Sequence, residues 1–312
     1  MNFQFTLRKR YFFILLLLAL FSSKVRSQTL DDAFMMNKTQ ICMGVFFTHS
    51  DWDHYWEGIY RRTNLNLGTV NSNSYSYGGI YGITDKLNIL ASVPYIFTNA
   101  SAGTLHGASG LQDLSLGLKY KAVNLKGRAG KLGLYGLAGV SLPTTNYLAD
   151  YLPLSIGLKS QTLSFRLLGD YQFHKYFFTG SYYYNFRRNI AIPKTAYYTT
   201  SLILSDQVQM PNTDGITLRS GFRSTHLVVE AIFQNYTTLG GFDIRTNDNP
   251  FPSNRMNWNS LGMNVKYEFK KPLNGFILYG GYNYVFQGRN VGQSKTFDIG
   301  LFYAFYISNN HK

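Results

Sequence analysis

The residues best suited to chemistry are concentrated in the segment HSDWDHYWEG at 49–58. Imidazole and carboxylate side chains can bind a divalent metal or act as general acids and bases. The candidates are His49, Asp51, Asp53, His54 and Glu57. Their spacing matches no specific metal-ligand motif, and polar loops of this kind are common on protein surfaces. We therefore expect a surface loop that holds no metal.

A hydrolytic mechanism would need a serine, a histidine and an orienting amide or carboxylate within hydrogen-bond reach. No histidine is followed closely by Ser-Asn-Gly, because His226 lies in Thr-His-Leu-Val and His174 lies in a predicted two-residue turn. We expect no enzymatic activity and no cofactor. A hydrolase remains the minor alternative, and it would depend on His54 or His226.

Ionisable residues also recur at alternate positions of apolar segments. In GLQDLSLGLKYK, at 110–121, Asp113 and Lys119 alternate with leucines. Successive side chains of a strand point to opposite faces, so this pattern predicts a strand with one apolar and one polar face. The ionisable residues predicted on polar faces are Asp113, Lys119, Arg166, Asp170, Arg187, Arg219, Glu230, Lys266, Glu268 and Asp298. The exceptions, Arg188, Asp214 and Lys295, begin or end their predicted strands.

The same two-faced pattern recurs along the chain. Strands are predicted at 41–48, 69–83, 87–98, 110–122, 131–142, 161–173, 176–188, 214–223, 226–238, 256–269, 275–286 and 295–307. Many contain about 10–13 residues, whereas strands of globular proteins average about 5–6 and tilted transmembrane strands need about 9–11. Short connections alternate with longer ones, which is the asymmetry of an outer-membrane barrel.

The N-terminus has the organisation of a secretory signal peptide. A positive stretch at 8–10 precedes an apolar run at 11–21, and Val25 and Ser27 suit a cleavage site before Gln28. We therefore assign 1–27 to a cleaved signal. The segment 28–40 is expected to be periplasmic or to fold into the barrel as a plug, and the barrel is expected to span 41–308.

Composition supports a strand-rich membrane protein. The chain has 25 Tyr, 24 Phe and 29 Gly but only 15% charged residues, against about 25% in typical soluble domains. Its formal charge of +14 is spread singly rather than in a stripe, so no nucleic-acid partner is expected. Cys42 is the only cysteine, which rules out an intramolecular disulfide.

These observations predict an all-β fold, a transmembrane antiparallel barrel of about twelve strands in the outer membrane. An alternative with fourteen strands would add 58–67 and 195–204. The leucines of 110–121 would face hydrocarbon, and the sheet would close because an unpaired strand edge is costly in lipid. Trp52 and Trp56 would lie at the membrane boundary. Lipid, lipopolysaccharide and the barrel-assembly machinery are the expected partners.

The stretch 69–145 resembles the putative MetA-pathway of phenol degradation family, a group of outer-membrane transporter-like barrels. A Gly-x-x-Asp-x-x-x-Gly-x-Lys-Tyr strand and a Gly-x-x-x-Pro-Thr strand end carry the resemblance, together with Tyr-Gly-Ile-Thr-Asp-Lys-Leu at 81–87. The matching residues are Gly110, Asp113, Gly117, Lys119, Tyr120, Gly139, Pro143 and Thr144. The usual Gly after Pro-Thr is Thr145 here. The resemblance implies a barrel that passes small hydrophobic or aromatic molecules.

The expected function is therefore diffusion of small hydrophobic or aromatic solutes through the outer membrane of a Gram-negative cell. The ten polar-face residues would line the lumen, where charges tune which solutes pass or merely brace the wall. If Ser224–Thr225 forms a two-residue turn, Arg219 lies opposite Glu230. A structural barrel that conducts nothing is the competing reading.

Overall fold

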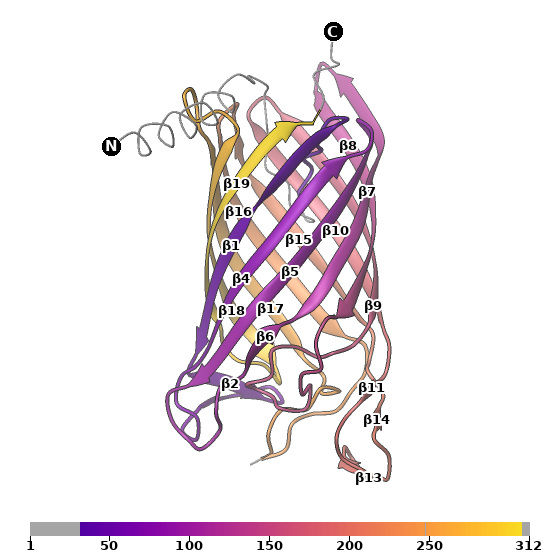
Figure 1. Cartoon of the computed structure of the whole chain (residues 1–312), viewed down its shortest axis with the longest axis vertical. Coiled ribbons are helices and arrows are strands. Elements are labelled where there is room, and N and C mark those ends of the chain that lie inside the picture. Colours follow the sequence, from indigo (N-terminus) through magenta and orange to yellow (C-terminus); the bar gives the residue numbers. More distant parts are fainter. Residues whose placement is uncertain (1–31, 247, 308–312) are drawn as a thin grey trace, which may run out of the picture.

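Twelve long strands form a closed antiparallel barrel in the computed structural model, which describes residues 32–246 and 248–307 (Figure 1). The barrel strands are β1 (Gln40–Trp52), β4 (Val70–Gly82), β5 (Leu87–Ala100), β7 (Asp113–Gly127), β8 (Gly130–Pro143), β9 (Thr162–Phe173), β10 (Tyr176–Arg187), β15 (Thr213–Arg223), β16 (Leu227–Thr238), β17 (Asn257–Glu268), β18 (Phe276–Arg289) and β19 (Lys295–Tyr306). The first and last strands pair with each other, so no long edge remains open.

The predicted count of twelve strands is confirmed, and the alternative of fourteen is wrong. The segment 58–67 contributes to a small hairpin of β2 (His54–Glu57) and β3 (Tyr60–Thr63) outside the barrel sheet. The segment 195–204 forms the pair β12 (Tyr197–Tyr198) and β13 (Leu202–Ile203). Strands this short cannot cross a bilayer. Two further short strands, β11 (Ile190–Ala191) and β14 (Gln207–Val208), pair in the same loop.

Strand β7 shows how the sequence pattern becomes an inside and an outside. Leu116, Leu118 and Tyr120 are 39%, 47% and 50% exposed, whereas Gly117 and Lys119 between them are buried. The outward residues, together with those of neighbouring strands, form an apolar exterior. Within the residues that the structure describes, no helix has the length and apolar character to cross a bilayer.

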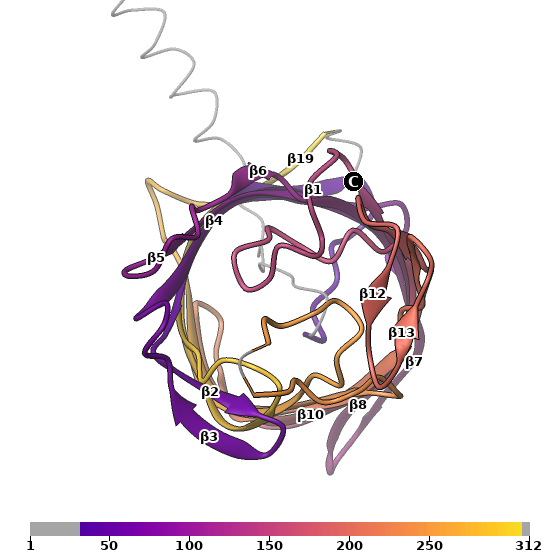
Figure 2. The same cartoon turned by 90° about the horizontal axis from the view of Figure 1, so that it is seen from below.

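The two ends of the barrel differ in their connections (Figure 1). Short turns at 83–86, 128–129, 174–175, 224–226 and 269–275 lie at one end. The connections at the other end are mostly longer, at 53–69, 101–112, 144–161, 188–212, 239–256 and 290–294. Figure 2, seen from the loop end, shows several of these loops crossing the barrel opening.

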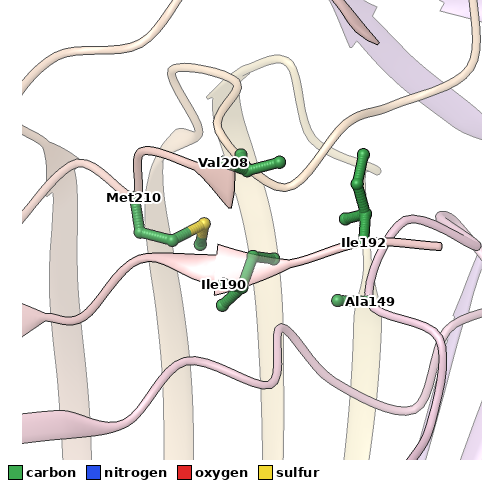
Figure 3. Packing of buried hydrophobic residues seen from close by; sticks show 5 residues of the cluster. All are labelled: Ala149, Ile190, Ile192, Val208 and Met210. Carbon is green, nitrogen blue, oxygen red and sulfur yellow. The ribbon is translucent and has the colours of Figure 1, made fainter. Parts of the chain in front are cut away.

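The long loops hold one another by a small apolar cluster. Ala149 from one loop packs with Ile190, Ile192, Val208 and Met210 from another, and Val208 is completely buried (Figure 3). Because these side chains are buried, the loops around them form an ordered cover at this end of the barrel.

A second contact fixes the loop that follows β16. The carboxylate of Asp243 accepts a hydrogen bond of 2.6 Å from Nη2 of Arg289 and one of 2.7 Å from Nδ2 of Asn290. The hydrogen bond from Arg289 is the main reason that the pKa of Asp243 falls from about 3.8 to about 2. This carboxylate therefore ties 239–256 to the end of β18.

The pairing of β15 with β16 differs from the prediction in one detail. The backbone N–H of Ser224 donates to the carbonyl of Leu227, so the turn is centred on Thr225–His226, and Arg219 pairs with Ile232 and Gly221 with Glu230. The expected Arg219–Glu230 contact nevertheless forms, because the two side chains meet diagonally across the ladder, with Nη1 of Arg219 at 2.6 Å from Oε1 of Glu230.

Candidate functional site

One half of the inner wall is built from very small side chains. The residues are Gly44, Ser76, Gly78, Ser92, Ser115, Gly117, Gly139, Ser141 and Ser164, on β1, β4, β5, β7, β8 and β9. They leave a cavity of about 440 Å³, which is bordered by the aromatic residues Phe46, Tyr183, Tyr279 and Phe302 and by Arg166. We call this space the upper cavity, where upper means toward the long-loop end of the barrel, which is drawn at the bottom of Figure 1. A wall of glycine and serine brings the backbone itself to the edge of the open space.

The opposite half carries buried charge in close pairs. Arg223 contacts Asp170 at 3.1 Å, and Asp170 also accepts a hydrogen bond from Thr179 at 2.5 Å. Glu230, which pairs with Arg219, accepts a second hydrogen bond from Asn264 at 3.2 Å. Each carboxylate therefore has a cation and a neutral donor, which is the arrangement that offsets the cost of burying charge.

The remaining predicted lumen residues have more varied contacts. Arg166 lies 4.7 Å from the centre of the Tyr183 ring, and Arg187 donates to the hydroxyl of Tyr236 at 2.5 Å. Asp298 accepts a hydrogen bond from Thr48 at 2.8 Å beside a second cavity of about 300 Å³. Glu268, at the short-turn end of β17, is half-buried.

Asp113 at the loop end accepts a hydrogen bond of 2.5 Å from Tyr147. Burial and this carboxylate raise the pKa of the Tyr147 hydroxyl well above its ordinary value. Tyr147 also accepts a hydrogen bond from the backbone N–H of Lys159. The first residue of β7 therefore organises the loop 144–161.

Residues 32–39 lie inside the barrel at the short-turn end. The backbone N–H of Thr39 donates to the carbonyl of Gly82 at 2.8 Å. A Cβ at Gly82 would stand 1.9 Å from the carbonyl oxygen of Asn37, so only glycine allows the segment this close to β4. We call 32–39 the inner segment.

Asp32 connects the inner segment to two lysines of the wall. Its carboxylate is 2.8 Å from Nζ of Lys266 and 3.4 Å from Nζ of Lys119, and Lys119 also donates to the Asp32 carbonyl at 2.5 Å. All three side chains are at most 5% exposed. Burial alone would raise the pKa of Asp32, but the two ammonium groups hold it well below its ordinary value.

Apolar residues of the inner segment pack on different parts of the wall. Ala33 contacts the cluster of Tyr135, Leu137 and Leu168, whereas Phe34 packs with Phe177 and Val228. Met36 packs with Cys42, Ile277 and Ala304. The segment therefore touches strands all around the lumen.

A third cavity lies beside the inner segment. On β8 the upper cavity is lined by Leu137 and the residues beyond it toward the loops, whereas Tyr135 and Lys131 line a space of about 270 Å³ at the short-turn end. Ala33, Phe34 and Met35 form part of this lower cavity. Lys119, which binds Asp32, pairs with Leu137, the residue of β8 at which the lining of the upper cavity begins.

Sequence reasoning missed two residues of this network. Asp32 was not singled out because it precedes the first strand, where no alternation assigns a face. Arg223 ends its predicted strand and was not assigned to the lumen. Its guanidinium lies 4.6 Å from the Phe34 ring centre and 4.0 Å from that of Phe177. The Phe-Met-Met run at 34–36 was the one signal that pointed to the inner segment.

The cluster at 49–58 does not converge, and the expectation of a surface loop is wrong for 49–52, which belong to the barrel strand β1. His49 contacts Asn73, Asp53 contacts His54, and Glu57 pairs with Arg62. Within 32–246 and 248–307, no three His, Cys, Asp or Glu side chains are arranged to hold a metal ion. Trp56 is 6% exposed beneath the loops, so the expectation that it lies at the membrane boundary is wrong. Gly288 leaves the space that this ring fills.

A sheet closed on itself, apolar outside and charged inside, is the architecture of a protein embedded in the outer membrane of a Gram-negative bacterium. No protein-family model and no curated protein matches the sequence. The fold is similar to the crystal structure of an outer-membrane channel from Pseudomonas putida F1, with a TM-score of 0.69 and 14% identity, over 90% of this chain and 100% of that chain.

Two other solved barrels are similar at lower scores. The translocator domain of the autotransporter NalP from Neisseria meningitidis has a TM-score of 0.47 and 13% identity, over 88% of this chain and 91% of that chain. The porin NanC has a TM-score of 0.45 and 10% identity, over 83% of this chain and 98% of that chain.

Proposed function

We propose that this barrel is an outer-membrane channel for small hydrophobic or aromatic molecules. The upper cavity is the observation that supports this most directly. Its volume of about 440 Å³ lies within the range of about 300–1,000 Å³ in which proteins bind small molecules. Its wall of glycine and serine offers little charge, and its aromatic border suits an apolar body with a few polar groups.

Two further observations support the proposal. The motif residues at 110–121 and 139–144 resemble a family of transporter-like barrels, and the similar fold from Pseudomonas putida F1 is described as an outer-membrane channel. We further propose that the short turns face the periplasm, that the long loops face lipopolysaccharide, and that the barrel-assembly machinery inserts the chain.

Filling the upper cavity tests the proposal. Ser164 lines this cavity on β9, and its neighbour Leu163 points outward with 42% exposure. In proteoliposomes, Ser164→Trp should reduce the flux of small aromatic solutes by roughly tenfold, because the indole would occupy the path. Leu163→Trp, on the opposite face, should leave the flux unchanged.

The competing function is a structural barrel that conducts nothing. The paired buried charges and the loops across the opening would suit that role as well. Planar-bilayer recordings and a solute-uptake panel of aromatic, fatty and sugar-like compounds separate the two. If a mature chain that lacks 28–38 also passes no solute, the channel proposal is wrong.

A further inference from the structure

Two buried ammonium groups meet at one carboxylate inside the lumen. Lys119 on β7 and Lys266 on β17 come from different sides of the barrel, and both bind Asp32. A buried cation without a compensating anion is strongly unfavourable, so this pair of lysines requires an anion at this position. In the structure, the anion belongs to the inner segment rather than to the barrel wall.

The same segment places a phenyl ring beside the carboxylate. The backbone N–H of Phe34 donates to Oδ1 of Asp32 at 3.1 Å, which holds the two residues in one compact turn. The Phe34 ring lies against Phe177 and Val228, with Nζ of Lys266 5.4 Å from its centre. Residues 32 and 34 thus present one carboxylate to two ammonium groups and one aromatic ring to Phe177, Val228 and the Arg223 guanidinium, which lies 4.6 Å from the centre of the Phe34 ring.

We propose that Lys119, Lys266 and the Phe177–Val228 pocket form a binding site for aromatic monocarboxylates, and that Asp32 and Phe34 occupy this site until such a solute displaces them. The proposal rests on the channel function above, which supplies the solute. Exchange of one carboxylate for another keeps the two lysines compensated, so it avoids the cost of leaving them unpaired. A neutral solute cannot make this exchange.

Displacement has a structural consequence because the inner segment packs on wall residues of both the upper and the lower cavity. Ala33 contacts Leu137, which lines the upper cavity, and Phe34 lines the lower one. Release of the segment would uncover this part of the wall, and we expect the two spaces then to join into one path. Binding of the solute would therefore open the path through which that solute crosses the barrel.

The experiment uses the mature barrel in micelles and a cysteine placed at Met36, which is 1% exposed in the docked segment. The buried Cys42 is replaced by alanine in all proteins. With the probe 3-phenylpropionate, maleimide labelling of Met36→Cys should become at least tenfold faster. Its neutral counterpart 3-phenylpropan-1-ol and acetate should have little effect, since each lacks one of the two recognised groups.

Two variants distinguish this site from a general loosening of the barrel. Asp32→Asn keeps the segment but removes the competing charge, so 3-phenylpropionate should bind at least tenfold more tightly by calorimetry. Lys266→Met should abolish that binding while the barrel keeps its heat-resistant folded migration on gels. Equal labelling with the acid and the alcohol, or unchanged binding by Lys266→Met, would overturn the site.

Failure of this site is distinguishable from failure of the channel. If the chain lacking 28–38 passes aromatic solutes but 3-phenylpropionate does not bind to Asp32→Asn, the channel stands and the anion site is rejected. If that chain passes no solute, the channel proposal fails first.

Discussion

Two buried carboxylates of the lumen each have two partners, an arginine and a neutral hydrogen-bond donor. Asp170 binds both Arg223 and Thr179, and Glu230 binds both Arg219 and Asn264. Removing one partner of such a group leaves an uncompensated charge, which costs far more than the pair itself contributes. The individual carboxylates are therefore the residues at which stability is most sensitive to substitution.

We expect Asp170→Asn to destabilise the barrel by about 3–5 kcal/mol, because Arg223 would remain buried without its carboxylate. The free energy of unfolding in urea, measured in detergent micelles, checks this value. Asp206→Asn is the matched control, since Asp206 is exposed in a loop and its substitution should change stability by less than about 0.5 kcal/mol. Equal effects of the two substitutions would contradict the prediction.

At the residue scale, the sequence predicted positions better than partners. Alternation assigns Lys119 and Lys266 to a polar face from their strands alone. It cannot predict that both bind Asp32, because that residue lies outside any strand and 87 positions from Lys119. Partners across a lumen depend on barrel closure, which local pattern does not encode.

At the scale of the strand, one face meets lipid and the other meets the lumen. Leu167, at the centre of β9, is 71% exposed, and Phe173 at the end of the same strand is 50% exposed. Leu167→Arg should destabilise the barrel by about 2–4 kcal/mol, whereas Phe173→Arg should cost about 0–1 kcal/mol. Unfolding in lipid vesicles measures both. If this face of β9 met water instead of lipid, both substitutions would change the free energy of unfolding by small and similar amounts.

At the scale of the loop, the contact between Asp243 and Arg289 should make the stability of 239–256 depend on pH. Its pKa is depressed to about 2 from about 3.8, so the contact with Arg289 is fully present above pH 3.8 and is lost as the pH falls through about 2. Hydrogen exchange of 239–256 should therefore accelerate between these values beyond the intrinsic rate. In Asp243→Asn the exchange should already be faster at neutral pH and should show no such step.

Strands were predictable because their period of two extends over ten or more residues, and the short turns followed from the gaps between them. The loops were not. The apolar cluster of Ile190, Ile192, Val208 and Met210 comes from a segment without a regular period, so nothing local predicts which side chains meet. For the same reason the sequence left 58–67 as a possible barrel strand, whereas Tyr60–Thr63 pairs with His54–Glu57 in a small hairpin.

The whole molecule has its apolar surface on the outside, so a bilayer or micelle must cover it. We expect the chain from residue 28 onward, produced without its leader, to gain β-structure and heat-resistant gel migration only when detergent or lipid is present. Circular dichroism with and without micelles measures this dependence. A folded monomer in plain buffer would contradict the assignment of inside and outside.

The short turn at Thr225–His226 has a consequence for the molecule as a whole. The length of the turn sets the register, which is the pairing of each residue of β16 with a residue of β15. Deleting Thr225 alone would shift this register by one position, so that Glu230 would face hydrocarbon and its apolar neighbours would face the lumen. Insertions and deletions should therefore be far better tolerated in the long loops, because a longer connection can change its length without shifting the register of the strands it joins.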